Sequence, residues 1–405
     1  MDVLFLSPAY PPEMIQFTRG LSQAGARVWG VGDSHVDALP ASVRSHLTAY
    51  LQVPRILDED DVMARVHNWL DGREMDRIEG NWEVVTLLAA RLRERYRVPG
   101  MSVDTVTGFR DKQLMKERVA AAGLRVPRSF RARSVAELRA HCKELGFPLV
   151  IKPVAGAGSA DTFRVATGDE LDQAIRATAH VSEVVVEEWV EGQEFTCETL
   201  CVDGVPVFES VSMYLPNTLV ARQNEWISPV ILTFRDLGAP ELQAGLQLSR
   251  DAIRALGMGT GFTHMEWFRN ERGEAVFGEI ACRPPGANMV DLMNYANDVD
   301  LFREWANVVV KRRFEATLKR AWNAAIIFKR AQGQGRIRQV IGMDDFRRKH
   351  RDHIAREDLL PVGALRRDWK ATFLSDGNLV VRHPDLGECR KLAETAASSI
   401  RMIAG

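Results

Sequence analysis

Residues 262–283 read FTHMEWFRNERGEAVFGEIACR, two apolar segments that each hold an acidic residue among apolar neighbours. The turn-forming residues 270–273 separate the segments, a pattern that predicts a β-hairpin. Since the strands of a hairpin lie side by side, we expect Glu266 and Glu279 to point to one face about one strand spacing apart. Two carboxylates this close repel unless a cation lies between them, and hard oxygen ligands of this kind suit Mg²⁺. A pair of surface acids is the alternative, although the apolar neighbours favour a buried functional pair.

Two nearby segments contain polar side chains that suit a charged substrate. Arg283 follows Glu279 by four positions and precedes a Pro-Pro-Gly sequence, so it could reach the carboxylates and hold an anion. Residues 213–229 are polar and aromatic without a clear periodicity. Because loops on a rigid sheet often carry specificity, we expect a substrate loop there that includes Arg222 and Gln223.

Upstream of the hairpin, residues 149–153 form a short apolar segment that contains Lys152. A loop of small residues follows, with Gly156, Gly158 and Ser159. Small residues let backbone amides approach phosphate oxygens, and a lysine ammonium neutralises charge on the same group. The loop leads into a strand and lacks the GxxxxGK[ST] pattern, so it is not a P-loop. A solvated hairpin turn with a surface lysine stays open as the alternative.

Residues 187–196 read EEWVEGQEFT, the end of a strand, an apolar hinge and a glycine followed closely by an acid. Such a segment can hold a nucleoside, because hinge backbone groups pair with the adenine edge and Glu194 can accept from ribose hydroxyls. A strand–turn–strand with charged rims is the plainer interpretation, and it also stays open.

The first hundred residues alternate short apolar segments with amphipathic ones. We expect strands at 3–6 and 28–31, and helices at 14–24, 60–70 and 82–95. This alternation is typical of a parallel sheet with crossover helices. The loop after the first strand contains three prolines and no GxGxxG, so it lacks the N–H groups that bind a dinucleotide.

Composition excludes several classes of function. The chain has 405 residues, with 53 Lys and Arg against 54 Asp and Glu, a formal net charge of −1. Such a balance favours neither nucleic acid nor an anionic membrane as a partner. No apolar run approaches the roughly 18 residues of a membrane span. The five cysteines are scattered, so we expect a reduced cytoplasmic protein without a disulfide framework or a structural zinc site.

The order and spacing of these segments resemble the ATP-grasp superfamily over about residues 100–310, with a preceding domain like the one that usually comes first. The hinge at 187–196 is similar to that of D-alanine–D-alanine ligases and biotin carboxylase-like members. Residues 108–112, 149–153 and 156–160 resemble the entry to the ATP-binding region, the second lysine strand and the mobile phosphate-covering loop.

The resemblance implies a role for each candidate residue. The nucleotide set is Lys112 and Lys152 on the α- and β-phosphates, the loop with Gly156, Gly158 and Ser159, the backbone of Glu188, Trp189 and Val190 on adenine, Glu187 at the hinge and Glu194 on the ribose. The catalytic set is Arg283, Lys152 and His264, with Glu266 and Glu279 on Mg²⁺ or Mn²⁺. His264 occupies a place where some members have a basic residue, but a hydrogen-bonded strand histidine is an equal alternative. Many members have Asn where this chain has Ala281, which puts a third protein ligand and a second metal ion in doubt.

The implied fold is α/β with α+β parts, divided into three domains. These are a Rossmann-like domain at 1–105, an ATP-grasp domain at 106–310 whose subdomains 106–190 and 191–310 sandwich ATP, and a small lid-like domain at 311–405. For the last domain the sequence also predicts a hairpin around residues 375–378.

The implied activity is that of an ATP-dependent carboxylate–amine ligase. A small carboxylic or amino acid is activated as an acyl phosphate and joined to an amine, with release of ADP and phosphate. An enzyme that phosphorylates bicarbonate or formate, as in carboxylases and purine pathways, is one alternative, and an inactive nucleotide-binding module is another. The N-terminal domain of such proteins often contributes to substrate binding and dimer contacts, so a homodimer is also an expectation of the resemblance.

Overall fold

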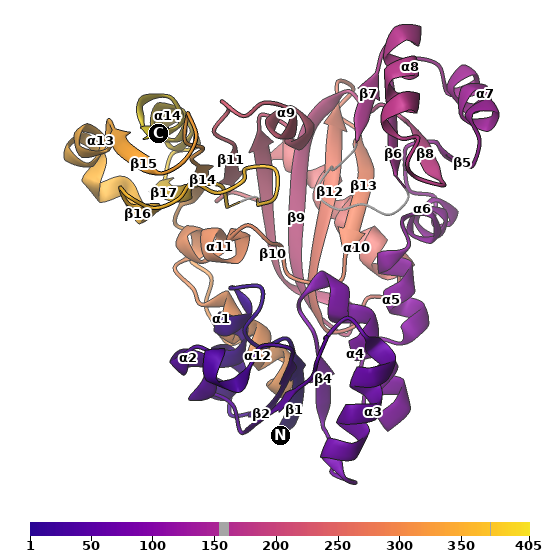
Figure 1. Cartoon of the computed structure of the whole chain (residues 1–405), viewed down its shortest axis with the longest axis vertical. Coiled ribbons are helices and arrows are strands. Elements are labelled where there is room, and N and C mark those ends of the chain that lie inside the picture. Colours follow the sequence, from indigo (N-terminus) through magenta and orange to yellow (C-terminus); the bar gives the residue numbers. More distant parts are fainter. Residues whose placement is uncertain (154–161, 373) are drawn as a thin grey trace.

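The computed structural model describes residues 1–153, 162–372 and 374–405, which form four β-sheets with helices around them (Figure 1). The N-terminal sheet has the strand order β3-β2-β1-β4, and its strands are parallel, as predicted. Its elements are β1 (Asp2–Leu6), α1 (Met14–Gln23), β2 (Arg27–Gly32), α2 (Ala41–Arg44), β3 (Ala49–Gln52), α3 (Glu59–Leu70), β4 (Arg77–Glu79) and α4 (Thr86–Tyr96). Every residue of β1 is buried, as is usual for a central strand between layers of helices.

A small antiparallel sheet follows, with the strand order β5-β8-β6-β7. Its elements are β5 (Ser129–Ala132), α7 (Val135–Leu145), β6 (Leu149–Pro153), β7 (Phe163–Val165), α8 (Gly168–Ala177) and β8 (Val184–Glu188), preceded by α5 (Val103–Arg110) and α6 (Lys112–Ala121). Strands β6 and β7 pair with each other, as the expected hairpin requires. The predicted loop residues Gly156, Gly158 and Ser159 lie outside the described residues.

The large sheet has the strand order β13-β12-β9-β10-β11-β14-β17-β16, and every pairing in it is antiparallel. Its first half consists of β9 (Gly192–Val202), β10 (Val205–Leu215), β11 (Val230–Thr233), β12 (Gly261–Asn270) and β13 (Ala275–Ala281), with α9 (Thr218–Gln223) and α10 (Pro240–Ala255) between them. Helix α10 packs so closely on this sheet that a Cβ at Gly245 would lie 2.1 Å from the ring of the buried Trp267.

The second half of the large sheet comes from the C-terminal part of the chain. Its strands are β14 (Asn323–Phe328), β16 (Ile354–Leu359) and β17 (Gly377–His383), with α13 (Met343–His350) and α14 (Leu386–Ser399) in the same part of the chain. Strands β15 (Ile337–Ile341) and β18 (Arg401–Ala404) pair with each other in a separate two-stranded sheet. Strand β14 pairs with β11, so hydrogen bonding continues across the boundary expected at residue 310. The hairpin expected around 375–378 is wrong: β17 begins at Gly377 and pairs with β14 and with β16, which ends well before it at Leu359.

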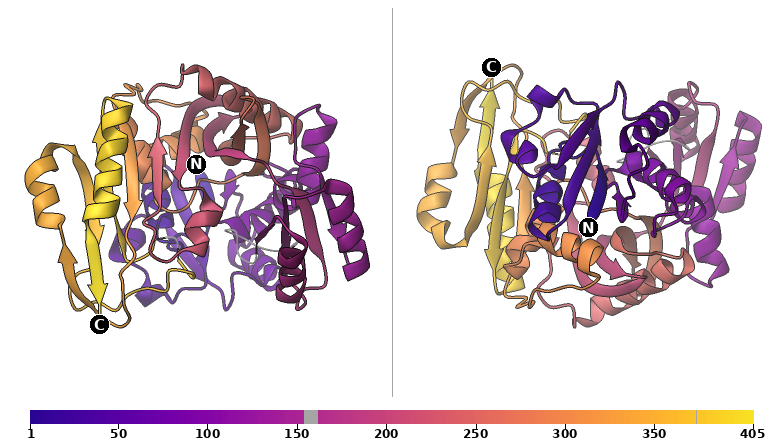
Figure 2. Two further views of the ribbon diagram at one scale, coloured as in Figure 1. Left: turned by 90° about the horizontal axis from the view of Figure 1, so that it is seen from above. Right: turned by 90° about the horizontal axis from the view of Figure 1, so that it is seen from below.

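The small sheet lies beside one end of the large sheet, and the C-terminal strands form the opposite end, as both views in Figure 2 show. Helices α11 (Met289–Asn297) and α12 (Leu301–Lys311) lead from the large sheet towards the N-terminal unit. Helix α12 packs on α1, where the ring of Phe17 lies 4.9 Å from Phe302 and 5.0 Å from Trp305, between centroids. Within the described ranges, no helix combines the length and the apolar character that a bilayer crossing needs.

Candidate active site

Glu266 on β12 and Glu279 on β13 lie directly opposite each other in the strand register, as the hairpin pattern predicts. Their side chains are 37% and 42% exposed, so the pair is open to a ligand and not buried as expected. Both residues lie on neighbouring antiparallel strands of the large sheet, and the register shifts at a bulge directly after Glu266. Burial alone would raise the pKa of Glu266, but the His264 imidazole and the charges of Lys112 and Arg283 lower it below its ordinary value.

His264 lies between two carboxylates of the large sheet. Its Nδ1 is 2.9 Å from Oε1 of Glu198, which is fully buried on β9, and its Nε2 is 3.7 Å from Oε1 of Glu266. Burial alone would lower the pKa of His264, but these two acids raise it to about 9. The imidazole is therefore charged near neutral pH, and it is also the hydrogen-bonded strand histidine of the alternative interpretation. Sequence reasoning missed Glu198. It lies opposite His264 in the pairing of β9 with β12, two positions after Thr196, which lies opposite Glu266.

Three lysines approach the carboxylates from α6 and β6. Lys112 pairs with Glu279, with 2.7 Å between Nζ and Oε2, and Lys152 pairs with Glu187, with 2.9 Å between Nζ and Oε2. Lys116, which the sequence analysis did not select, pairs with the same oxygen of Glu187. The signal that could have found Lys116 is its spacing of four residues from Lys112, which places both on one face of α6.

Glu187 is the shared anion of two of these lysines. Burial alone would raise the pKa of Glu187, but the adjacent Lys152 and Lys116 lower it to about 2. Burial lowers the pKa of Lys116, while Glu187 and the more distant acids hold the pKa of Lys152 above its usual value despite its burial. Lys116, Lys152 and Glu187 therefore form a cluster with two basic groups and one acidic group.

Three arginines contact the hinge after β8. Glu188 pairs with Arg125, at 2.5 Å between Oε1 and Nη2, and its backbone N–H donates to the carbonyl oxygen of Arg128 at 2.8 Å. The Arg164 guanidinium lies 5.1 Å from the ring centroid of Trp189. The Trp189 indole N–H is buried and has no hydrogen-bond partner among the described residues, and Val190 beside it is half-buried.

Glu194 lies at the start of β9 and connects the sheet to α9. It is 5% exposed, and its two oxygens accept from the backbone N–H of Thr218 at 2.7 Å and from the Thr218 hydroxyl at 2.9 Å. Burial and the nearby charge of Glu266 raise the pKa of Glu194 to about 7. A carboxylate in this place can still accept from another donor, because each oxygen has two lone pairs.

Arg283 is held from the N-terminal unit by Glu83, a residue that sequence reasoning also missed. One oxygen of Glu83 accepts from Nε of Arg283 and the other pairs with Arg110, while Nη1 of Arg283 donates to the carbonyl of Pro284 at 2.8 Å. Burial alone would raise the pKa of Glu83, but the two arginines lower it. Glu83 follows β4 at the C-terminal edge of the parallel sheet, a usual place for functional side chains, and this signal could have found it.

The two substrate residues expected from the sequence, Arg222 and Gln223, lie at the end of α9. Nη1 of Arg222 donates to the carbonyl oxygen of Lys370 at 2.7 Å, so this side chain contacts the C-terminal loop. Gln223 is the exposed last residue of α9. The charge of Arg283 lowers the pKa of Glu266, so Arg283 lies near the carboxylate pair, whereas Arg222 contacts the C-terminal loop.

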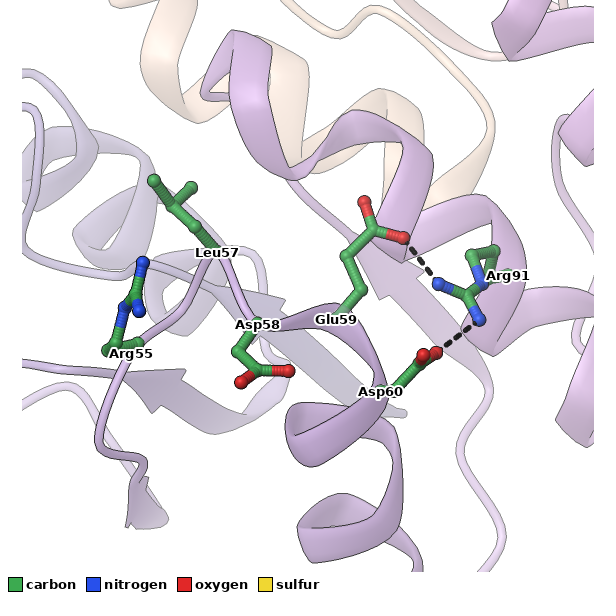
Figure 3. Close-up of a pocket in the computed structure, with 6 residues that line it drawn as sticks. All are labelled: Arg55, Leu57, Asp58, Glu59, Asp60 and Arg91. Carbon is green, nitrogen blue, oxygen red and sulfur yellow. Dashed lines mark hydrogen bonds and ion pairs between the residues drawn. The ribbon is translucent and has the colours of Figure 1, made fainter.

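A hollow of about 410 Å³ on the N-terminal unit is separate from these residues (Figure 3). There Arg91 of α4 bridges Glu59 and Asp60 at the start of α3. Over the part of the chain that the structure describes, no group of three or more His, Cys, Asp or Glu side chains is arranged to hold a metal ion.

Comparisons with known proteins agree with this geometry. Residues 119–296 match the family model of the D-ala D-ala ligase C-terminus. An L-arginine-specific L-amino acid ligase of Bacillus subtilis is 26% identical over 244 residues, which cover 58% of this chain and 58% of that protein. The chain thus spans less than two thirds of this relative.

Solved structures show the same fold over the whole length. The L-amino acid ligase of Bacillus licheniformis has a TM-score of 0.78 at 18% identity and covers 100% of this chain and 98% of its own. N5-carboxyaminoimidazole ribonucleotide synthetase of Thermotoga maritima has a TM-score of 0.70 at 16% identity, with 100% and 99% covered. Residues 119–296 are thus similar to the C-terminal family of D-ala D-ala ligases, and the whole chain has the fold of these solved ligase and synthetase structures.

Proposed function

We propose that the chain is an ATP-dependent ligase that joins a carboxylic acid to an amine. One observation carries this proposal: two accessible carboxylates in strand register, Glu266 and Glu279, lie close to two cations, Lys112, which pairs with Glu279, and Lys152, whose pKa both carboxylates raise. A ligand with a metal cation on one side and phosphates on the other would satisfy both sets of charges.

The carboxylate pair fits a divalent cation that is bound together with phosphates. Mg²⁺ in proteins usually takes one or two carboxylates and completes its shell with water and phosphate oxygens. Glu266 and Glu279 supply two, and the side chain of Ala281 supplies none. Bound there, Mg²⁺ or Mn²⁺ would neutralise negative charge on the β- and γ-phosphates. The charged His264 balances Glu198 and Glu266 and keeps Glu266 ionised for this role.

The remaining side chains would hold the nucleotide. Lys112 and Lys152 would exchange their present carboxylate partners for the α- and β-phosphates. The hinge backbone would hold adenine through Trp189 and Val190, since the N–H of Glu188 is already bonded to Arg128. Glu194 would accept from the ribose hydroxyls.

The reaction proceeds in two displacements. An oxygen of the substrate carboxylate attacks the γ-phosphorus, and the bond from that phosphorus to the bridging oxygen breaks, giving ADP and an acyl phosphate. The amine nitrogen then attacks the acyl carbon, phosphate leaves with the bonding pair, and the nitrogen loses a proton. Arg283, held by Glu83, stabilises the oxyanion that forms on the acyl oxygen.

The activated acid is proposed to be an amino acid or a related small acid. The name of the Bacillus subtilis relative, an L-amino acid ligase, supports this class. The charges of Arg283 and Arg110 exceed that of Glu83 by one, and an arginine is well suited to a planar carboxylate.

Phosphate release from ATP with paired acids and amines tests the proposal. Release that needs both an amino acid and an amine, together with a new amide product by mass spectrometry, supports it. Release that needs only bicarbonate or formate would instead indicate an enzyme that phosphorylates those anions. ADP binding without release for any pair would indicate a nucleotide-binding module.

A further inference from the structure

The cluster of Lys116, Lys152 and Glu187 contains one more cation than its own carboxylate needs. Both ammonium groups contact the same oxygen, Oε2 of Glu187. Lys116 and Glu187 are 7% and 8% exposed, so this part of the cluster is shielded from water. A second lysine in such a place costs desolvation energy, since burial disfavours the charged form.

The two lysines differ in what else surrounds them. Lys152 is on β6, its side chain is 23% exposed, and it feels the charges of both Glu279 and Glu266. Lys116 is on α6, its side chain is 9% exposed, burial is the largest influence on its pKa, and Glu279 is the one member of the carboxylate pair whose charge raises that pKa. Lys152 is therefore the more exposed member of the cluster and the one on which both carboxylates act, and Lys116 is the more buried member.

Lys116 would keep Glu187 paired when Lys152 binds a phosphate. When Lys152 turns to a phosphate, Glu187 loses one ion pair, and a buried carboxylate without a partner is strongly unfavourable. At Glu279 the corresponding loss of Lys112 would be made up by the metal ion. At Glu187 the cation that remains is Lys116.

We infer that Lys116 is a positioning residue for nucleotide binding: it keeps Glu187 neutralised and thereby releases Lys152 to the phosphates. This inference rests on the proposed nucleotide site. Without Lys116, Lys152 would stay on Glu187 and nucleotide affinity would fall.

The affinity for ADP with Mg²⁺, measured by isothermal titration calorimetry, tests this role. We expect Lys116→Met to weaken ADP binding about 10- to 100-fold, as loss of one charge-assisted contact from Lys152 would. Lys116→Arg, which keeps the charge, should stay within about threefold of the wild type. Circular dichroism and thermal unfolding of each variant check that the fold is kept.

A double variant separates charge balance from direct contact with the nucleotide. With Glu187→Gln there is no carboxylate to retain Lys152, so Lys116→Met/Glu187→Gln should bind ADP about as tightly as Glu187→Gln alone. This comparison also holds if Lys116→Met by itself folds poorly, because the double variant removes the buried carboxylate together with its buried lysine.

Two results would overturn the inference while leaving the proposed function intact. One is unchanged ADP affinity in Lys116→Met, and the other is a loss that Glu187→Gln does not restore, which would mean that Lys116 itself contacts the nucleotide. A wild-type protein that binds no ADP would overturn the proposed function and this inference with it.

Discussion

The two sides of the site carry opposite excesses of charge. The large sheet contributes four carboxylates and one imidazole, namely Glu194, Glu198, Glu266, Glu279 and His264. The side formed by α6 and the small sheet contributes three ammonium groups and one carboxylate, namely Lys112, Lys116, Lys152 and Glu187. Only the Lys112–Glu279 pair joins the two sets among the ion pairs of the described residues. The charges of neither side are balanced by its own residues. A ligand with separate positive and negative parts would neutralise the excess charge of both sides.

The largest effect should come from removing one carboxylate of the large-sheet side. We expect Glu279→Gln to lower ATP-dependent phosphate release by about 10³-fold, because a metal ligand and its charge are lost. ADP binding should be largely kept, since the lysines are unchanged. Glu271→Gln, at the exposed turn of the same hairpin, is the matched control. Persistent turnover in Glu279→Gln would remove this residue from the metal site.

Removing a lysine from the side formed by α6 and the small sheet should affect nucleotide binding more than the chemical step. We expect Lys152→Ala to weaken ADP affinity about 10- to 100-fold, measured by calorimetry, because a phosphate loses a charged donor. Lys143→Ala on the exposed face of α7 is the control in the same unit. Equal affinities in the two variants would contradict the assignment of a phosphate to Lys152.

A smaller effect is expected from the residue that connects the N-terminal unit to the site. Glu83→Gln should lower kcat about 10-fold with little change in ADP affinity, because Arg283 loses the ion pair that orients it. Glu74→Gln, exposed on the same unit, controls for a general loss of charge. If ADP affinity fell as much as kcat, Glu83 would belong with the nucleotide-binding residues.

The smallest effect concerns the pH dependence of stability. The pKa of Glu194 rises from its ordinary 4.5 to about 7 on folding, so the folded state holds an extra proton between those values. Its contribution to stability is therefore present below pH 4.5 and lost as pH rises through about 7. In urea unfolding between pH 4 and 8, Glu194→Gln should flatten this decline. An unchanged slope would show that Glu194 is ionised throughout.

The hairpin and the N-terminal sheet could be predicted because local patterns determine them. Alternating apolar residues around 270–273 place Glu266 opposite Glu279, and strand–helix alternation gives the parallel order of β1 to β4. The partners of the site residues could not be predicted in this way. Glu83 meets Arg283 across 200 positions of sequence, and Glu198 is indistinguishable from other strand acids until β9 pairs with β12.

The sheet that crosses residue 310 was missed for a similar reason. The pairing of β14 with β11 depends on which strand edge is left open after the first half of the sheet is built, and not on the composition of β14. Arg222 was selected for its polar surroundings, but its contact with Lys370 depends on the C-terminal loop.

The packing of α12 on α1 has a consequence for how the chain is made. The core that contains Phe5 and Phe17 is completed by Phe302 and Trp305, which are synthesised roughly 200 residues after the N-terminal unit has ended. At about 5–20 residues per second, a ribosome needs on the order of 10–40 s to reach them. During that interval the core between α1 and the first sheet lacks the side chains of α12, so an early part of the chain is completed only by a late one.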